Sequence, residues 1–389
     1  MLKRLLKITL GTGLLTFVTA VVVSVATRLP LEAPSARGAL EWVGAIHVHT
    51  VASDGGGTLA EVAEAARVTE LDFVTITDHN LWAMSGPEYM EGRLMVLGEE
   101  ARVPSGHILV IGGDDPKERR ARRAEAEERG SPLGSSVPAG AGLRIVAHPE
   151  GPGEPWQDWD PAGFDALEIW NWDTELRDDG FGDWPKALLL LPLDPVSAML
   201  ELLDRPTASL ERWDQLLSDG HRVPGVCSVD AHSNVPVTRE LALPFPAYRD
   251  LFSLARQHVL LGAEPTGDPA NDAALVTEAL RFGRSFCALD GIADASGFSA
   301  EAVSLHGSVT FGGELPWEAE GVRITASVPE VSAPTTVKLF RDGLVVSEGR
   351  GPDYDSGLLA APGVYRLEIY VELRRGQVPW IFSNPIWVL

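Results

Sequence analysis

Histidines at the edges of apolar segments constrain this chain more than any other feature of its sequence. Six of its nine histidines directly follow or open such a segment: His47, His49, His79, His107, His148 and His232. A lone histidine in an apolar strand is more often a structural, hydrogen-bonded residue than a ligand. Imidazoles and carboxylates gathered at strand ends, however, are what a site for several metal ions requires. Six such histidines in one chain therefore favour a metal centre.

The first two of these histidines form a chelating pair. His47 and His49 are two residues apart on an extended segment, so both rings project from the same face and can hold one ion. Asp54 follows in a glycine-rich turn, where the backbone can bring a carboxylate close to the rings without steric cost. Thr58 and Glu61 then form a capping box, which predicts a helix after the glycines. The segment therefore predicts a strand, a ligand loop and a helix.

The same arrangement recurs further along the chain. Strands are expected at residues 72–77, 94–97, 143–147, 164–170 and 223–229, and most of them end at a potential ligand. These ligands are His79, Glu99 or Glu100, His148, and Asp230 with His232. Ligands gathered at the carboxyl ends of apolar, parallel strands predict an α/β fold. An α/β barrel and an open doubly wound sheet both place ligands there, and the periodicity does not separate the two.

Seven short motifs follow one another in a fixed order. They are His47-x-His49-Thr50, Ser53-Asp54-Gly55, Thr77-Asp78-His79, Gly98-x-Glu100, Gly106-His107, Ala147-His148-Pro149 and Asp230-Ala231-His232. In this order they resemble the polymerase and histidinol phosphatase (PHP) family of metallohydrolases, over roughly residues 44–295. The resemblance implies a distorted (β/α)₇ barrel. Gly98-Glu99-Glu100, Gly106-His107 and Glu168-Ile169-Trp170-Asn171 look closest to the branch of the family that contains carbaryl hydrolase.

The resemblance also implies nine metal ligands. His47, His49, Glu100 and Asp230 would hold a first ion, Glu100, His107 and His148 a second, and Asp54, His79 and His232 a third, with Glu100 bridging the first two. Asp54 stands where some relatives carry histidine. Glu99 is an alternative to Glu100, but the Gly-x-Glu spacing favours Glu100. Nitrogen and oxygen ligands without a thiolate suit two to three divalent ions of Mn, Fe or Zn.

The chemistry implied by this site is hydrolysis by a metal-activated hydroxide. Closely spaced divalent ions lower the pKa of a shared water toward neutrality and polarise the scissile group. Asp230 is the expected proton acceptor. Glu168 and Asn171 are candidate substrate contacts, although core packing and turn formation suit the same segment equally well. Phosphoester hydrolysis is the commonest reaction of the family, and hydrolysis of an amide, a carbamate or a carboxyl ester is the alternative.

Two further observations bear on the function. A phosphate site usually carries Arg or Lys near the metals. Here the motif loops hold few cations besides Arg144 and Lys186, and they are rich in tryptophan, such as Trp156 and Trp159, which favours a neutral or apolar substrate. A rival hypothesis is an exported, metal-stabilised binding module without turnover. The complete set of ligands argues against it.

The N-terminal residues predict export. Lys3, Arg4 and Lys7 precede the apolar stretch Ile8–Ala26, which predicts a hydrophobic helix. Residues 1–28 are therefore a signal peptide or a transmembrane signal anchor, and either one exports the rest of the chain. If uncleaved, the segment would hold the protein at the membrane. Residues 29–43 then form a linker, residues 44–298 the PHP-like domain and residues 299–389 a separate C-terminal domain.

Charge and cysteine content narrow the partners. The net charge of −23 excludes nucleic acid as a partner, because an acidic surface repels phosphate backbones, and leaves a small-molecule ester as the expected substrate. The basic run Lys117–Arg129 alternates with glutamates and predicts a solvated helix. Cys227 and Cys287 each lie in an apolar strand, so buried free thiols are the default expectation, and export would also allow a disulfide. The oligomeric state is not set by the sequence.

After about residue 300 the pattern changes to the alternation of β-strands. Tyr365, Leu367, Ile369 and Val371 alternate with Arg366, Glu368, Tyr370 and Glu372. Asp342-Gly343 stands between two apolar segments and predicts a hairpin. A C-terminal β-sandwich that packs against the barrel is the expected arrangement.

Overall fold

The computed structural model describes residues 31–33, 37–113, 117, 142–178, 187, 188, 190–236, 242, 243, 245–318 and 321–389. The predicted signal peptide or anchor with its hydrophobic helix, nearly all of the basic run Lys117–Arg129, and Lys186 lie outside the described residues. Among the helices that are described, none has the length and apolar character needed to span a bilayer.

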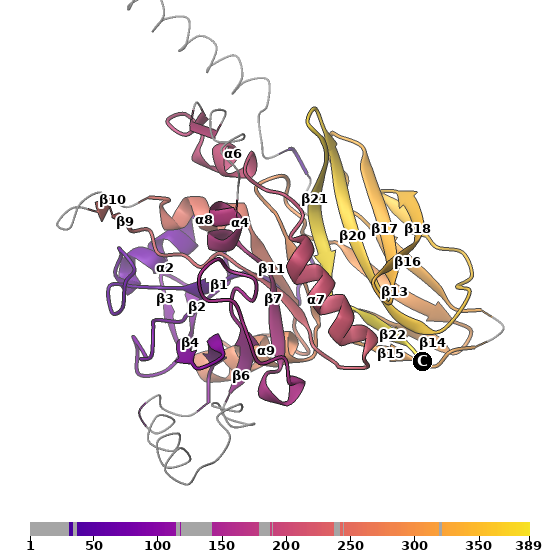
Figure 1. The fold of residues 1–389 in the computed structure, drawn as a ribbon, viewed down its shortest axis with the longest axis horizontal. Helices are drawn as coiled ribbons and strands as arrows, with labels where there is room; N and C mark the ends of the chain where they lie inside the picture. The colour runs from indigo at the N-terminus through magenta and orange to yellow at the C-terminus, as the bar shows by residue number, and fades with distance from the viewer. Residues whose placement is uncertain are drawn as a thin grey trace, which may run out of the picture.

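One large mixed sheet organises the first three quarters of the chain (Figure 1). Its strands here are β1 (Glu41–Val48), β2 (Phe73–Ile76), β3 (Glu88–Met90), β4 (Arg93–Val103), β5 (Gly106–Ile111), β6 (Leu143–Val146), β7 (Ala166–Asn171), β8 (Gly225–Ser228), β11 (Arg256–Leu260) and β12 (Ser285–Ala288). The spatial order is β12-β11-β1-β2-β4-β5-β6-β7-β8, and β3 pairs with β4. The expected strand segments are thus present, and the fold is mixed α/β.

The strands are not all parallel, although the sequence patterns predicted parallel pairing. The pairs β1–β2, β2–β4, β6–β7 and β7–β8 are parallel, whereas β4–β5, β5–β6, β1–β11 and β11–β12 are antiparallel. Only Pro104 and Ser105 separate β4 from β5. A parallel neighbour needs a crossover of a dozen or more residues, so this short turn makes the pair a hairpin. Glu100 consequently lies inside β4 and not at its end.

The predicted barrel is not closed by a strand ladder in the described part of the chain. Beyond β8, residues 229–231 exchange backbone hydrogen bonds with residues 46–49, at and just after the end of β1, including the bond from His49 N to Ala231 O at 3.0 Å. Side chains join β8 to its other neighbours. The Cys227 amide donates to Gln257 Oε1 of β11 at 2.9 Å, and Cys227 forms a disulfide with Cys287 of β12. The default expectation of two free thiols is therefore wrong.

Helices and apolar side chains cover this sheet. The helices are α2 (Leu59–Val68), α4 (Trp172–Asp178), α6 (Pro195–Leu200), α7 (Thr207–Ser218), α8 (Tyr248–Leu254) and α9 (Pro269–Arg281), with the 3-10 turn η2 (Pro161–Gly163). The predicted capping box starts α2, where Thr58 N donates to Glu61 Oε2 at 2.8 Å. One hydrophobic cluster joins Ile46 and Phe73 to Val276 of α9. A larger cluster holds Val48 and Ile76 and continues into the C-terminal region.

The C-terminal region is built from two groups of strands that share one core (Figure 1). The strands β15 (Glu314–Leu315), β17 (Thr335–Arg341), β18 (Leu344–Arg350), β20 (Gly363–Leu373), β21 (Gly376–Ser383) and β22 (Ile386–Val388) continue the large sheet through the β12–β21 pair. The strands β13 (Ser299–Ser304), β14 (Gly307–Val309), β16 (Arg323–Ser327) and β19 (Asp353–Asp355) form a separate sheet, and β9 (Val235–Pro236) pairs with β10 (Ala242–Leu243) elsewhere. The predicted hairpin at Asp342-Gly343 joins β17 to β18.

Candidate metal centre

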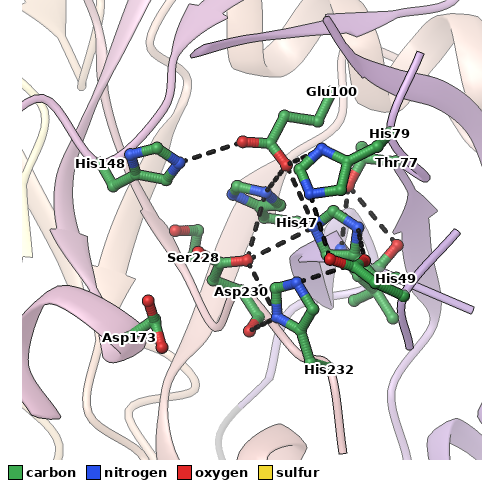
Figure 2. A network of polar contacts seen from close by, with 12 residues as sticks. His47, His49, Thr77, His79, Glu100, His148, Asp173, Ser228, Asp230 and His232 are labelled. Carbon is green, nitrogen blue, oxygen red and sulfur yellow. Dashed lines mark hydrogen bonds and ion pairs between the residues drawn. The ribbon is translucent and has the colours of Figure 1, made fainter. Parts of the chain in front are cut away.

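All nine predicted ligands lie in one cluster that is centred on the carboxylate of Glu100. Figure 2 shows Glu100 among His47, His49, His79, His148, Asp230 and His232. The Oε2 atom of Glu100 lies 3.1 Å from His47 Nε2, 3.2 Å from His49 Nε2 and 3.1 Å from His79 Nδ1. Its Oε1 atom lies 2.6 Å from His107 Nδ1 and 3.0 Å from His148 Nε2. One buried carboxylate therefore faces five imidazoles, which is the geometry of a bridging ligand.

Asp230 and Asp54 complete the cluster on two sides. Asp230 Oδ1 lies 3.3 Å from His47 Nε2 and 3.4 Å from His49 Nε2. Asp54 Oδ2 lies 3.3 Å from His79 Nε2, and its Oδ1 lies 3.5 Å from His232 Nε2. Asp230 is buried, whereas the Asp54 side chain is half exposed at the mouth of the site.

The backbone is held in an uncommon conformation at three of the ligands. His47, His148 and Asp230 have φ values of 68°, 30° and 44°. Non-glycine residues seldom adopt positive φ, and such strain persists where the surrounding structure enforces it, often at functional sites. At His47 the register between β1 and β2 also shifts, so the two rings of the chelating pair converge through an irregularity of the strand.

The donor atoms fit a cation better than they fit one another. His47 Nε2, His49 Nε2 and Asp230 Oδ1 are buried and have no hydrogen-bond partner. Buried polar atoms are almost always hydrogen-bonded, so three such atoms pointing at one place indicate a missing partner. In each of three sets, the donor atoms lie within 4.8 Å of one another. The sets are His49, Asp54, His79 and His232; His47, His49 and Glu100; and His79, Glu100 and His107. These imidazole and carboxylate sets suit divalent transition metals.

The electrostatics of the site call for positive charge. Burial by itself would raise the pKa of Glu100, but His47, His107 and His148 outweigh it and hold the pKa well below its ordinary value. Burial would likewise raise the pKa of Asp230, but His47 and His49 outweigh it and lower this pKa. Protons on the imidazoles or bound divalent cations can supply the charge that these carboxylates require.

The imidazoles shift in the opposite direction. Burial lowers the pKa of His47, yet Asp230 and Glu100 outweigh it and raise the pKa well above its ordinary value. Burial also opposes the shifts at His148 and His232, but Glu100 raises the pKa of the first and Asp54 that of the second, each to about 9. A proton and a metal ion would compete for these ring nitrogens, because a ligating histidine must be neutral.

Glu168 and Asn171 lie behind the ligands and not in the wall of the cavity. Glu168 Oε1 is 2.8 Å from His47 Nδ1, and Glu168 Oε2 accepts from the His148 amide at 2.7 Å and from Asn171 Nδ2 at 2.8 Å. Asn171 Nδ2 also donates to Ser228 Oγ at 3.0 Å. Both side chains are buried. Their position suits the orientation of His47 and His148 better than contact with a substrate.

A cavity of about 350 Å³ opens onto the cluster. Beside the ligands it is lined by the loop from Gly151 to Glu154 and by Asp173, Thr174 and Arg177 of α4. Arg177 pairs with Asp173 at 2.6 Å. Sequence patterns gave no sign of this wall, because its side chains stand in a loop and a short helix without a ligand motif. Trp156 and Trp159 instead pack edge-on against Phe164.

Sequence reasoning missed two other contributors to the site. Asp78 is buried and accepts hydrogen bonds from Thr50 N at 2.9 Å and from Ser53 Oγ at 2.6 Å, which shapes the loop that carries Asp54. Its place in the Thr-Asp-His motif could have marked it. Glu154 Oε2 lies 3.1 Å from His107 Nε2, and both its carboxylate oxygens accept from Arg102 Nη2 at 2.5 Å. The lone Glu154 in a loop carried no signal.

Comparisons with known proteins add little to this geometry. No family model and no curated protein matches the sequence. The chain is similar in structure to a two-domain protein from Bacteroides vulgatus that contains a predicted PHP-like metal-dependent phosphoesterase. That similarity has 12% identity and a TM-score of 0.41, and covers 92% of this chain and 98% of the other. An amidohydrolase from Chromobacterium violaceum, solved with sulfate and without metal, has 15% identity and a TM-score of 0.30, over 49% of this chain and 87% of the other. Likeness at these scores carries no argument about function.

Proposed function

We propose that the chain is a metal-dependent hydrolase of small-molecule esters, with a phosphoester as its substrate. The observation that carries the proposal is the convergence of His47 Nε2, His49 Nε2 and Asp230 Oδ1, all buried and without hydrogen-bond partners, beside the carboxylate of Glu100. Leaving such atoms unpaired is costly, and a divalent cation among them would remove the cost.

The proposed ligands are grouped as the family resemblance implies. His47, His49, Glu100 and Asp230 would hold one ion, Glu100, His107 and His148 another, and Asp54, His79 and His232 a third. The distances support the clustering of these residues. They also bring His49 within 3.4 Å of Asp54 and His79 within 3.1 Å of Glu100, so neighbouring groups share contacts. Bound divalent ions would supply Lewis acidity and lower the pKa of a bound water.

The chain's own groups orient the ligands and move the proton. The Glu168 carboxylate accepts a hydrogen bond from His47 Nδ1. The lone pair of His47 Nε2 is then free to point toward the proposed metal site. Asp230 uses Oδ1 toward His47 and His49, and its Oδ2 lies 3.5 Å from Asn171 Nδ2. We assign to Asp230 Oδ2 the acceptance of a proton from the attacking water.

The cavity wall supports an anionic substrate of small size. A volume of about 350 Å³ is within the range of small-molecule sites. Arg177 lines the cavity with a 60% exposed side chain, and guanidinium groups bind phosphoryl oxygens well. Asp173 and Glu154 stand in the same wall and would repel an anion. They favour the second candidate, an amide, carbamate or carboxyl ester in the same site.

The test is elemental analysis of the purified protein together with chromogenic phosphomonoester, phosphodiester and carboxyl-ester substrates. We expect two to three Mn, Fe or Zn ions per chain, in keeping with the nine proposed ligands, and turnover of a phosphoester. Turnover of only the carboxyl ester would select the second candidate. A protein that binds less than about one ion after reconstitution and turns over nothing would favour a binding module and refute the proposal.

We also propose that the chain acts outside the cytoplasm. The Cys227–Cys287 disulfide supports export, because disulfides persist mainly in oxidising compartments. A fusion of residues 1–40 to a reporter that is active only after export tests the localisation. Release of the reporter into the medium would indicate a cleaved signal, and retention in the membrane fraction would indicate an anchor. An inactive reporter would contradict export.

A further inference from the structure

Tyr248, the first residue of α8, lies beneath the loops that carry half of the metal centre. Its hydroxyl accepts a hydrogen bond from Gly57 N at 3.1 Å. The same oxygen lies 2.8 Å from the His49 carbonyl oxygen and 3.2 Å from that of His232, and it donates its proton between them. The side chain is only 6% exposed. One buried hydroxyl thus contacts the backbone of three separate points in two ligand loops.

These two loops are residues 49–57, which carry His49 and Asp54, and residues 230–234, which carry Asp230 and His232. They also bond to each other directly. Gly56 N donates to His232 O at 2.7 Å, and Asn234 Nδ2 donates to Asp54 O at 2.8 Å. Tyr248 belongs to neither loop but contacts both of them where they meet. The relative position of the two loops therefore depends on the packing of α8.

The glycines before α2 leave room for the Tyr248 ring and for the second loop. A Cβ atom on Gly57 would come within 2.6 Å of Tyr248 Cε2, and one on Gly56 within 2.2 Å of Ser233 O. The loop, the tyrosine ring and the second loop therefore pack with no spare room, and the glycines are required by close approach.

We infer that Tyr248 is a positioning residue for the ligands that these two loops carry, and so for the first and third of the proposed ions. The inference rests on the proposed metal site. Tyr248 fixes the carbonyl groups of His49 and His232, and the amide that closes the Asp54 loop. His107 and His148 are positioned differently, by β5, by Glu168 and by Glu154. Loss of the Tyr248 hydroxyl should therefore affect one part of the centre and spare the other.

The experiment compares Tyr248→Phe with the wild-type chain by calorimetric titration with Mn²⁺ and by metal analysis after dialysis against a weak chelator. We expect the ions that these two loops help to hold to lose affinity by about 10–100-fold, the usual effect of removing a group that orients ligands, while the ion at Glu100, His107 and His148 binds as before. Hydrogen exchange should show faster exchange at the Gly57 amide, which loses its acceptor.

Tyr365→Phe is the matched control. Tyr365 is also buried, and its hydroxyl, on a side chain of β20 far from the ligands, donates to the Ala361 carbonyl at 2.5 Å. It should leave metal binding unchanged. Unchanged binding in Tyr248→Phe, or equal weakening of every ion, would overturn the inference and leave Tyr248 a packing residue. A wild-type chain that binds no metal would overturn the proposed function and this inference together. If the variant is poorly soluble, exchange at Gly57 in the folded fraction still decides the hydrogen bond.

Discussion

Two regions of this molecule bury clusters of ionisable side chains, and the clusters are built in opposite ways. The first is the metal centre around Glu100. The second, which we call the α7–β20 network, lies between α7 and β20 and consists of Arg205, Asp214, Arg366, Glu368 and Tyr370. Arg366 binds both Asp214 oxygens at 2.7 Å, and Glu368 accepts from Arg205, Arg366 and Tyr370.

The difference lies in which atoms are satisfied. No side-chain atom of the α7–β20 network is among the buried polar atoms without a hydrogen-bond partner in the described part of the chain, whereas three donor atoms of the candidate metal centre are. A fully paired buried network holds two parts of a protein in one arrangement. Buried charge alone therefore does not mark a functional site. Several buried donor atoms without hydrogen bonds that converge beside a cavity are the distinguishing feature of the candidate centre.

Glu100→Gln should have the largest effect. The amide cannot bridge two cations, so we expect the metal content to fall to about one ion per chain or fewer. Hydrolysis should fall more than about 10³-fold, since the ions supply several kcal/mol of stabilisation to the transition state. Elemental analysis and steady-state kinetics measure both. Glu64→Gln, on the exposed face of α2, is the control, and an equal metal content in both variants would contradict the assignment.

Arg366→Met should affect stability without affecting the metals. Removing Arg366 leaves Asp214 buried without its cation and Glu368 with Arg205 alone, which costs about 3–5 kcal/mol of unfolding free energy. Urea unfolding measures the change. Arg323→Met removes an exposed pair with Asp355 and should stay close to wild type. If Arg366→Met instead lost bound metal at unchanged stability, the contrast between the two clusters would be wrong.

Glu168→Gln should weaken the centre less than loss of a ligand does. The neutral amide holds the His47 ring less firmly, so we expect metal affinity to fall by about 10–100-fold, with the ion count preserved at saturating metal. Titration calorimetry separates affinity from stoichiometry. Affinity equal to that of the wild-type chain would show that the strand alone orients His47.

The smallest expected effect is the acid sensitivity of the α7–β20 network. Burial opposes ionisation of Glu368, but Arg205 and Arg366 outweigh it and lower its pKa to about 2 from an ordinary value of 4.5. Because the folded-state pKa is depressed, this contribution to stability is present above pH 4.5 and is lost as the pH falls toward 2. The wild-type chain should therefore lose stability more steeply than Glu368→Gln across this window. Parallel slopes in urea unfolding at several pH values would show that Glu368 is not ionised in the fold.

The sequence predicted which side chains cluster better than it predicted the sheet. Ligand positions follow from short local patterns, such as His47-x-His49, and six histidines in apolar surroundings are hard to reconcile with a purely structural role. Strand direction depends on connections. The two-residue turn at Pro104 and Ser105 makes β5 antiparallel to β4. In the sequence these residues separate the Gly98-x-Glu100 and Gly106-His107 motifs, and the motifs themselves carry no information on strand direction.

Strand β20 shows a second limit of sequence patterns. Its alternation of apolar with charged residues is typical of a sheet with one face in water. The structure buries Arg366, Glu368 and Tyr370 against α7, because Asp214 and Arg205 supply the opposite charges. These partners lie far away in the chain, at separations of 152 residues for Arg366–Asp214 and 163 for Arg205–Glu368. No local window could have shown that the charged face is covered.

The side-chain links at β8 bear on when the site is completed during synthesis. Besides Gln257 and Cys287, β8 is held by Asn384, which accepts from Gly225 N at 2.8 Å and donates to Gly225 O at 2.9 Å. Asp230 and Asn384 are 154 residues apart in the sequence. At about 5–20 residues per second, the ribosome needs roughly 8–30 s to make that stretch. Strand β8, which leads into the loop of Asp230 and His232, therefore has its full set of neighbours only when nearly the last residues of the chain have been made.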